Sequence, residues 1–171
     1  MKHQTILAST VFMIAGAFAA PMASAECDIS QTKCAVNGNK CNIKFRNKTG
    51  DASGSSGGTT LDQTTMASAL WITARDDDGD RVGNQLSLGL GENKTINLTK
   101  KANKKNGFES IKAMVQEKNG PVDPARISCE EIKTILNGSG TCKIFYGRKK
   151  GTTMKYALGY DCDGGNVSGP K

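Results

Sequence analysis

The sequence predicts a mainly β fold: a disulfide-stapled antiparallel β-sandwich or barrel-like domain with one short helix in its C-terminal half and a terminal β-hairpin. Three observations predict it. Short runs that alternate apolar and polar residues recur between turn-forming residues, as in antiparallel sheets. The chain has six cysteines, 20 glycines and few aromatic residues, so hydrophobic burial needs the support of covalent cross-links. Residues 128–138 alone carry both the start and the stop signals of a helix.

Residues 1–25 are predicted to be a cleaved signal peptide. A cationic start precedes an apolar run over residues 6–20, and small residues lead up to Ala25. A transmembrane anchor is the alternative, but the run is shorter than the roughly 20 residues that cross a bilayer, and no second long apolar stretch follows. We therefore expect an exported protein, periplasmic or secreted and bacterial, whose mature chain begins near Glu26 and has no transmembrane segment.

Cleavage of this leader removes His3, which is the only histidine in the chain. Without an imidazole the mature protein cannot build a Ser-His-Asp or Cys-His nucleophile, a histidine general base or a His-ligated zinc site. Carboxylate pairs, a lysine nucleophile and an all-oxygen metal site remain chemically open. Most common hydrolase designs are excluded, so we expect a protein that is not an enzyme.

All the cysteines follow the predicted cleavage site, and in an exported chain an even set predicts three disulfides. They are Cys27, Cys34, Cys41, Cys129, Cys142 and Cys162. A thiolate metal site is the alternative, but the chain has no CxxC motif and the spacing of the first three cysteines differs from that of a zinc knuckle.

Asn37-Gly38 is a signal for a two-residue hairpin turn between two short strands. Counting outward from this turn places Cys34 opposite Cys41 as near neighbours. The pair falls at a hydrogen-bonded site, whose wider separation suits a disulfide less well, so their bond is left open. Residues 49–60, rich in glycine, serine and threonine, are expected to form a surface loop, with an interdomain linker as the alternative.

Residues 68–90 alternate on both sides of a turn and predict a hairpin. In its first strand, Leu70 and Ile72 share one side, and Trp71 lies on the other. Trp71 could stack on a sugar or a base, although a lone tryptophan in an alternating strand favours a place in the core.

Two further short strands are expected, over residues 93–98 and 108–118. With the hairpin they place an antiparallel β domain at residues 26–122. The pattern resembles that of immunoglobulin-type sandwiches, a resemblance that concerns architecture only. The two prolines of "GPVDPAR" mark a boundary or a crossing loop, so residues 123–171 are expected to form a short helix and a β-hairpin packed on the same domain.

Ser128 is the expected N-cap of the helix, and Gly138 is expected to end it. Glu130 and Glu131 occupy the first turn, where the helix dipole favours anions. They are the obvious carboxylate pair for a glycosidase, but adjacent helical residues point about 100° apart and do not face one substrate together.

The last segment predicts a hairpin whose turn lies near residues 150–153. This register brings Cys142 opposite Cys162, which makes them the preferred disulfide pair. Cys129 is then left to join one of the amino-terminal cysteines.

The stretch "ARDDDGDRVG" is the best candidate for a metal site. No register of an EF-hand loop fits it: a start at Asp76 puts Arg81 at the glycine position and Ser87 at the glutamate position, and a start at Ala74 lacks the first ligand and the final glutamate. A looser calcium site could use Asp76, Asp78 and Asp80 with backbone carbonyls. The alternative is a hairpin turn at Asp78-Gly79 with solvated acidic side chains, which the flanking alternation favours. No cofactor is expected, and calcium is the one alternative.

Basic residues form two clusters that could bind the phosphate or sulfate groups of an anionic polymer or a protein partner. The first cluster comprises Lys100, Lys101, Lys104 and Lys105, and the second comprises Arg148, Lys149 and Lys150. The alternative is that both are solvated loops that keep the protein soluble.

These features predict an exported, non-enzymatic binding or interaction protein that presents loops of a β scaffold to a macromolecular partner. The partner is an unidentified protein or an anionic polymer at the cell surface or in the periplasm. One alternative is a small exported inhibitor that inserts the "DDDGD" or "GRKKG" hairpin into an enzyme's cleft. The second alternative is a calcium-dependent or other oxygen-ligand metal enzyme centred on the three aspartates.

Overall fold

The computed structural model describes residues 26–50, 55–56, 59–64, 66–102, 107–115, 122–152 and 155–163. The predicted signal peptide lies outside the described residues, as do Lys104 and Lys105 of the first basic cluster.

The larger of two sheets is built around its longest strand, β10. Its members are β1 (Asn42–Asn47), β2 (Ser55–Ser56), β3 (Thr59–Thr64), β6 (Asn93–Asn97), β8 (Val122–Asp123), β10 (Thr141–Lys149) and β11 (Tyr156–Asp163). One edge of β10 pairs antiparallel with β11. Its other edge pairs first with β1, in parallel, and then with β3, antiparallel. The terminal hairpin therefore lies in the same sheet as the first strand of the chain.

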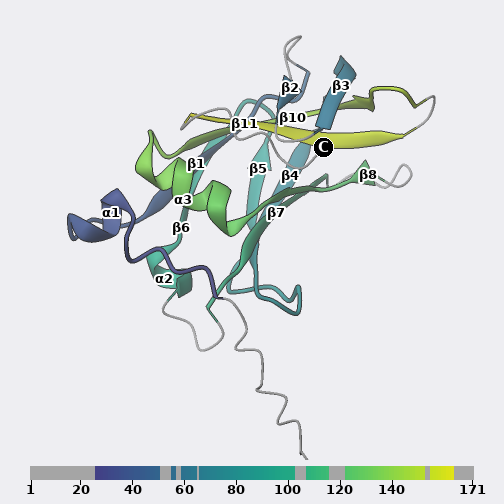
Figure 1. Ribbon diagram of the computed structural model, residues 1–171. Helices are drawn as coiled ribbons and strands as arrows, with labels where there is room; N and C mark the ends of the chain where they lie inside the picture. The colour runs from purple at the N-terminus through teal and green to yellow at the C-terminus, as the bar shows by residue number, and fades with distance from the viewer. Residues whose placement is uncertain are drawn as a thin grey trace, which may run out of the picture.

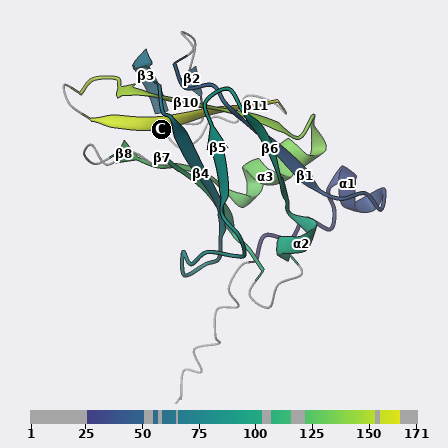
Figure 2. The same ribbon diagram turned by 180° about the vertical axis from the view of Figure 1, so that it is seen from behind.

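The smaller sheet is antiparallel throughout and has the order β5-β4-β7-β9. Its strands are β4 (Ala69–Arg75), β5 (Leu86–Gly89), β7 (Ser110–Val115) and β9 (Ala125–Ile127). The strands of the two sheets run in crossing directions, one sheet over the other (Figures 1 and 2). The predicted mainly β, sandwich-like fold is confirmed, and the described strands do not close into a barrel.

The core lies between the sheets because alternate residues of each strand point inward. In β4, Leu70, Ile72 and Ala74 are fully buried, and Phe45 and Ile144 meet them from the larger sheet. Burying one such Leu, Ile or Phe side chain stabilises the fold by about 1.5–3 kcal/mol.

One end of the sandwich is covered by the predicted helix, α3 (Cys129–Asn137) (Figure 1). Ser128 is its N-cap and forms a capping box with Glu131, and Gly138 follows its last residue. Ile132, Ile135 and Leu136 are buried. The helix is thus stabilised by its apolar face and by its N-terminal cap.

The predicted amino-terminal hairpin is wrong. Residues before Asn37 form a helical turn, α1 (Lys33–Val36), instead of a strand. Gly38 has a φ of 68°, and its backbone N–H donates to Ala35 O. An Asn-Gly pair supplies the left-handed conformation that ends a helix as readily as the one that makes a hairpin turn, so the dipeptide alone does not distinguish them.

Two other segments expected to be loops contain short strands. Residues 55–56 pair with residues 59–60 inside the predicted surface loop, where β2 and β3 meet. The crossing loop at "GPVDPAR" contains β8 and leads into β9, which pairs with β7. β2, β8 and β9 are each only two or three residues long. Runs this short do not show an alternating pattern in the sequence.

The structure contains the three expected disulfides, and no cysteine is free. Cys142 and Cys162 are directly opposite in the terminal hairpin and are bonded, as its register predicts. Cys129 bonds to Cys27 and so links the start of α3 to the amino-terminal segment. The remaining bond joins Cys34 to Cys41. Three disulfides indicate an oxidising compartment.

Candidate functional site

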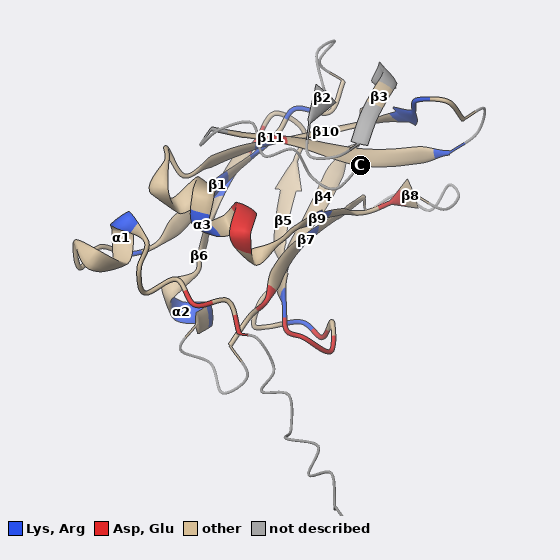
Figure 3. Ribbon diagram, viewed as in Figure 1, with Lys and Arg blue, Asp and Glu red and all other residues tan. Residues whose placement is uncertain are grey.

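A group of basic and apolar side chains lies on the outer face of the smaller sheet. We call this group the cationic face, and it consists of Trp71, Arg75, Lys112, Met114 and Arg126. The alternation that turns the apolar residues of β4, β7 and β9 into the core turns these side chains outward. Figure 3 shows the basic residues of the smaller sheet in blue, above a red hairpin tip.

Within the cationic face, positive charges are direct neighbours. Lys112 of β7 is opposite Arg126 of β9 and, on its other side, opposite Thr73 of β4. Residues directly opposite in an antiparallel pair have Cβ atoms about 4.5–5.5 Å apart, and like charges there are destabilising. No ion pair to Lys112 or Arg126 is formed within the described part of the chain.

The electrostatics of Lys112 reflect this crowding. Burial and then the positive charges of Arg75 and Arg126 lower the pKa of the Lys112 ammonium below its usual value. The folded protein thus disfavours the charge that Lys112 carries at neutral pH. A bound anion would offset the effects of burial, Arg75 and Arg126 on Lys112, since it would supply a counter-charge and new hydrogen-bond acceptors.

Arg75 is held in place by two hydrogen bonds. Its Nε donates to Thr73 Oγ1 at 3.0 Å, and its Nη1 donates to Gly79 O in the hairpin tip at 3.0 Å. Thr73 is fully buried, so this guanidinium lies against the sheet. Ordering of this kind in the free protein lowers the entropic cost of binding a ligand.

The larger sheet offers a contrast. Lys143 of β10 has Arg46 on one side, but on the other it is opposite Asp161, whose carboxylate lies 3.9 Å from its Nζ. Lys143 therefore has a counter-ion opposite it within the protein, whereas Lys112 has Arg126 on one side and the uncharged Thr73 on the other.

The predicted metal residues lie in the hairpin tip between β4 and β5 (Figure 3). Asp76 is buried, and its Oδ1 accepts a 2.7 Å hydrogen bond from the backbone N–H of Asp80. Gly79 has a φ of 81° and donates its N–H to Asp76 O. The side chain of Asp76 thus closes the turn. Among the described residues, no three carboxylate or thiolate side chains gather where they could hold a metal ion.

We expect millimolar calcium to leave the melting temperature of the protein unchanged relative to a chelator, because Asp76 already bonds to the backbone of its own turn. Differential scanning calorimetry in both conditions checks this. A melting temperature that rises with calcium concentration would restore the calcium site at Asp76, Asp78 and Asp80, since a ligand that binds only the folded state raises its stability.

The first basic cluster is partly structural. Lys101, in α2 (Thr99–Ala102), donates from Nζ to Val82 O at 2.6 Å and to Asn84 O at 3.3 Å, which fastens the chain after the hairpin tip to the helix. Lys100 borders a hollow of about 340 Å³ beside it.

The second basic cluster lies at the turn that follows β10. Lys149 pairs with Asp123 at 3.7 Å, and Lys150 is exposed. This turn and α2 lie at opposite ends of the molecule (Figures 1 and 2). The two predicted clusters therefore do not combine into one binding surface.

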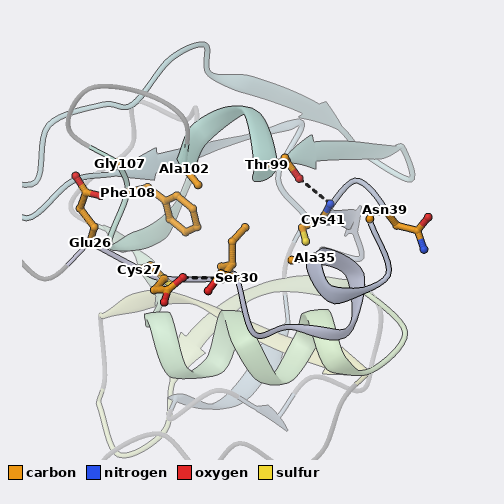
Figure 4. A pocket seen from close by; sticks show the side chains of 13 residues that line it. Glu26, Cys27, Ser30, Ala35, Asn39, Cys41, Thr99, Ala102, Gly107 and Phe108 are labelled. Carbon is orange, nitrogen blue, oxygen red and sulfur yellow. Dashed lines mark hydrogen bonds between the residues drawn. The ribbon is translucent and has the colours of Figure 1, made fainter.

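A cavity of about 510 Å³ lies between the amino-terminal segment, α1 and α2. The ring of Phe108 and the side chains of Ala35 and Ala102 line it (Figure 4). Of its carboxylates, Asp28 accepts a hydrogen bond from Ser30 N at 2.8 Å. That bond is the main cause that lowers the pKa of Asp28. A general acid needs the opposite shift, so Asp28 is not placed to donate a proton at neutral pH.

Glu130 and Glu131 point to different surroundings, as the helix geometry predicts. Glu130 is exposed and pairs with Lys133 at 3.0 Å. Glu131 is buried and accepts a 2.5 Å hydrogen bond from the Tyr160 hydroxyl. Burial and this carboxylate raise the pKa of Tyr160 far above its ordinary value. The contact between Glu131 and Tyr160 is therefore a structural one inside the fold.

No family model matches the chain, and neither a curated protein nor a solved structure is significantly similar to it. In the part of the chain that the structure describes, none of the helices is long and apolar enough to cross a membrane.

Sequence reasoning missed the cationic face. It placed Trp71 in the core, which is wrong, because Trp71 is half-buried on the outer side of β4. The alternation of β4 did place Trp71 and Arg75 on one side. The opposition of Lys112 and Arg126 had no sequence signal, since it arises only when β7 and β9 pair.

Proposed function

We propose that this protein is an exported binding protein, not an enzyme, which holds an anionic polymer on its cationic face. The observation that carries the proposal is the direct opposition of Lys112 and Arg126, with Arg75 close enough to depress the Lys112 pKa. An arrangement that destabilises the free protein is relieved by an anion, as is typical of sites that recognise phosphate, sulfate or carboxylate groups.

Other features support a binding role over catalysis. The only histidine lies in the predicted leader. Asp28 has a lowered pKa, and Glu131 bonds to Tyr160 and to the N-cap Ser128. A retaining or inverting glycosidase needs a general acid with a raised pKa, whereas the pKa of Asp28 is lowered.

The test uses the protein without residues 1–25 and linear polyphosphate as the probe. The double variant Lys112→Gln/Arg126→Gln is expected to bind at least about tenfold more weakly, because each lost charge-assisted contact is worth about 1.5–3 kcal/mol. Binding by the parent should also weaken steeply between about 50 and 200 mM salt. Affinity is measured by fluorescence anisotropy of labelled polyphosphate.

The matched control is Lys133→Gln/Lys143→Gln, which removes the same charge from α3 and from the larger sheet. It is expected to retain most of the affinity. Equal losses in the two double variants would mean that net charge alone causes binding, and would overturn the assignment to the cationic face.

Stability supplies a second readout. Lys112→Gln is expected to raise the free energy of unfolding at neutral pH by about 0.5 kcal/mol, since it removes a like-charge neighbour. Below the lowered pKa, Lys112 is charged in both the folded and the unfolded states, so the penalty is fully present. The gain should shrink as the pH rises through that pKa. Urea unfolding at neutral and alkaline pH measures it.

A further inference from the structure

The cationic face contains an apolar row beside its charges. Trp71 of β4 and Met114 of β7 are directly opposite each other, and both are half-buried on the outer side of the sheet. The next outward position along each strand belongs to Thr73 and Lys112. Lys112 is therefore a diagonal neighbour of Trp71, within reach of a long side chain.

This apolar row has no role in the core of the protein. The inward residues of the same strands, Leu70, Ile72 and Ala113, are fully buried, whereas Trp71 is only half-buried. A large flat ring in this position offers an apolar platform with a polar N–H at its margin. Ser87, opposite Trp71 on its other side, is exposed and adds a hydroxyl.

We infer that the anionic polymer is an acidic polysaccharide, an inference that rests on the proposed function. One sugar ring lies with its C–H face on the indole of Trp71 and the thioether of Met114. Its carboxylate pairs with Lys112 and accepts hydrogen bonds from the guanidinium of Arg126, which can donate two of them in a bidentate fashion. The apolar row of Trp71 and Met114 lies about 7 Å along the strands from the row that contains Lys112 and Arg126. One ligand unit with a ring and a charged substituent can therefore span both rows.

A single-stranded nucleic acid also combines rings with charges, but the face fits it less well. Proteins that bind such strands stack successive bases on several aromatic side chains. Trp71 is the only tryptophan of the chain, and on the described part of the cationic face it is the only aromatic residue. One platform beside several cations is better matched to a chain of charged sugars.

The experiment compares three probes at one ionic strength: polygalacturonate, linear polyphosphate and oligothymidylate. Trp71→Ala is expected to weaken binding of polygalacturonate by about tenfold, the lower part of the range for ring stacking on an aromatic side chain. Binding of polyphosphate, which has no ring, should remain unchanged. Tyr156→Ala, which removes a partly exposed aromatic side chain from the larger sheet, is the control and should bind both polymers as the parent does.

A second measurement does not depend on any variant. Because Trp71 is the sole tryptophan, its emission reports on this platform alone. Polygalacturonate should shift the emission of the unmodified protein to shorter wavelength, and polyphosphate should not. Trp71→Phe keeps a ring at the site and should retain part of the polygalacturonate affinity.

The outcomes separate the two proposals. If the parent binds polyphosphate through Lys112 and Arg126 but Trp71→Ala does not change polygalacturonate binding, the polysaccharide inference fails and the proposed function stands. If neither polymer binds, the proposed function fails as well. Tighter, Trp71-dependent binding of oligothymidylate would replace the polysaccharide by a nucleic acid.

Discussion

Replacing Cys27 and Cys129 together by serine is expected to lower the free energy of unfolding by about 5 kcal/mol, because the bond closes a loop of about 100 residues. Its two cysteines are 102 positions apart in sequence, the widest separation among the three disulfides. Opening this loop gives the unfolded chain far more conformational freedom. Urea unfolding of the oxidised double variant and the parent, monitored by circular dichroism, measures the difference.

The control for this prediction is Cys34→Ser/Cys41→Ser, which opens a bond between cysteines only seven positions apart. The same loop-entropy relation gives a cost of about 2.4 kcal/mol for so short a loop. An equal or larger cost for this second variant would contradict the long-range role of the Cys27–Cys129 bond. Peptide mapping without reduction verifies the pairing in the parent.

Removal of the Asn47 side chain is expected to cost about 3 kcal/mol, because it removes several buried hydrogen bonds at once. Asn47 is only 1 % exposed. Its Nδ2 donates to Leu88 O at 3.2 Å and to Ala67 O at 3.4 Å, and its Oδ1 accepts from Thr49 Oγ1 at 2.6 Å. These bonds join β1 of the larger sheet to the chain on either side of β4 in the smaller one.

The measurement is thermal and urea unfolding of Asn47→Ala. Asn93→Ala, an exposed asparagine in the neighbouring strand β6, serves as the control and should change stability by less than about 0.5 kcal/mol. Asn47→Asp should be at least as damaging as Asn47→Ala, since it keeps the shape but removes the donor and buries a charge. A small effect at Asn47 would mean that water replaces its contacts.

Local sequence signals predicted those elements whose partners are near in the chain. The capping box at Ser128 and the apolar spacing that follows it specify α3 without reference to the rest of the molecule. The register of the terminal hairpin depends only on the turn between its strands, so Cys142 could be placed opposite Cys162. In β4, alternation placed Trp71 and Arg75 on the side opposite Leu70 and Ile72, although the lone tryptophan was expected in the core.

A sequence signal that is compatible with two local structures could not be assigned from the neighbouring residues alone. Asn37-Gly38 fits both a hairpin turn and the end of a helix, and the contact that selects the helix comes from far away. The backbone N–H of Lys33 donates to the side chain of Asn137 in α3 at 2.8 Å. The sequence likewise predicted a turn in the acidic hairpin tip. The hydrogen bond that the Asp76 carboxylate accepts within that turn, however, depends on its buried position.

The amino-acid sequence was sufficient to predict the mainly β character of this protein, its helix in the C-terminal half, its three disulfides and the lack of histidine chemistry after the predicted leader. These properties follow from composition and from periodicity over a few residues. The opposition of Lys112 to Arg126, with Trp71 beside them, arises instead from the pairing of β4, β7 and β9. The physical reason is that pairing between strands is not encoded in either strand alone: β7 and β9 acquire their shared charge pattern only when the sheet places them side by side.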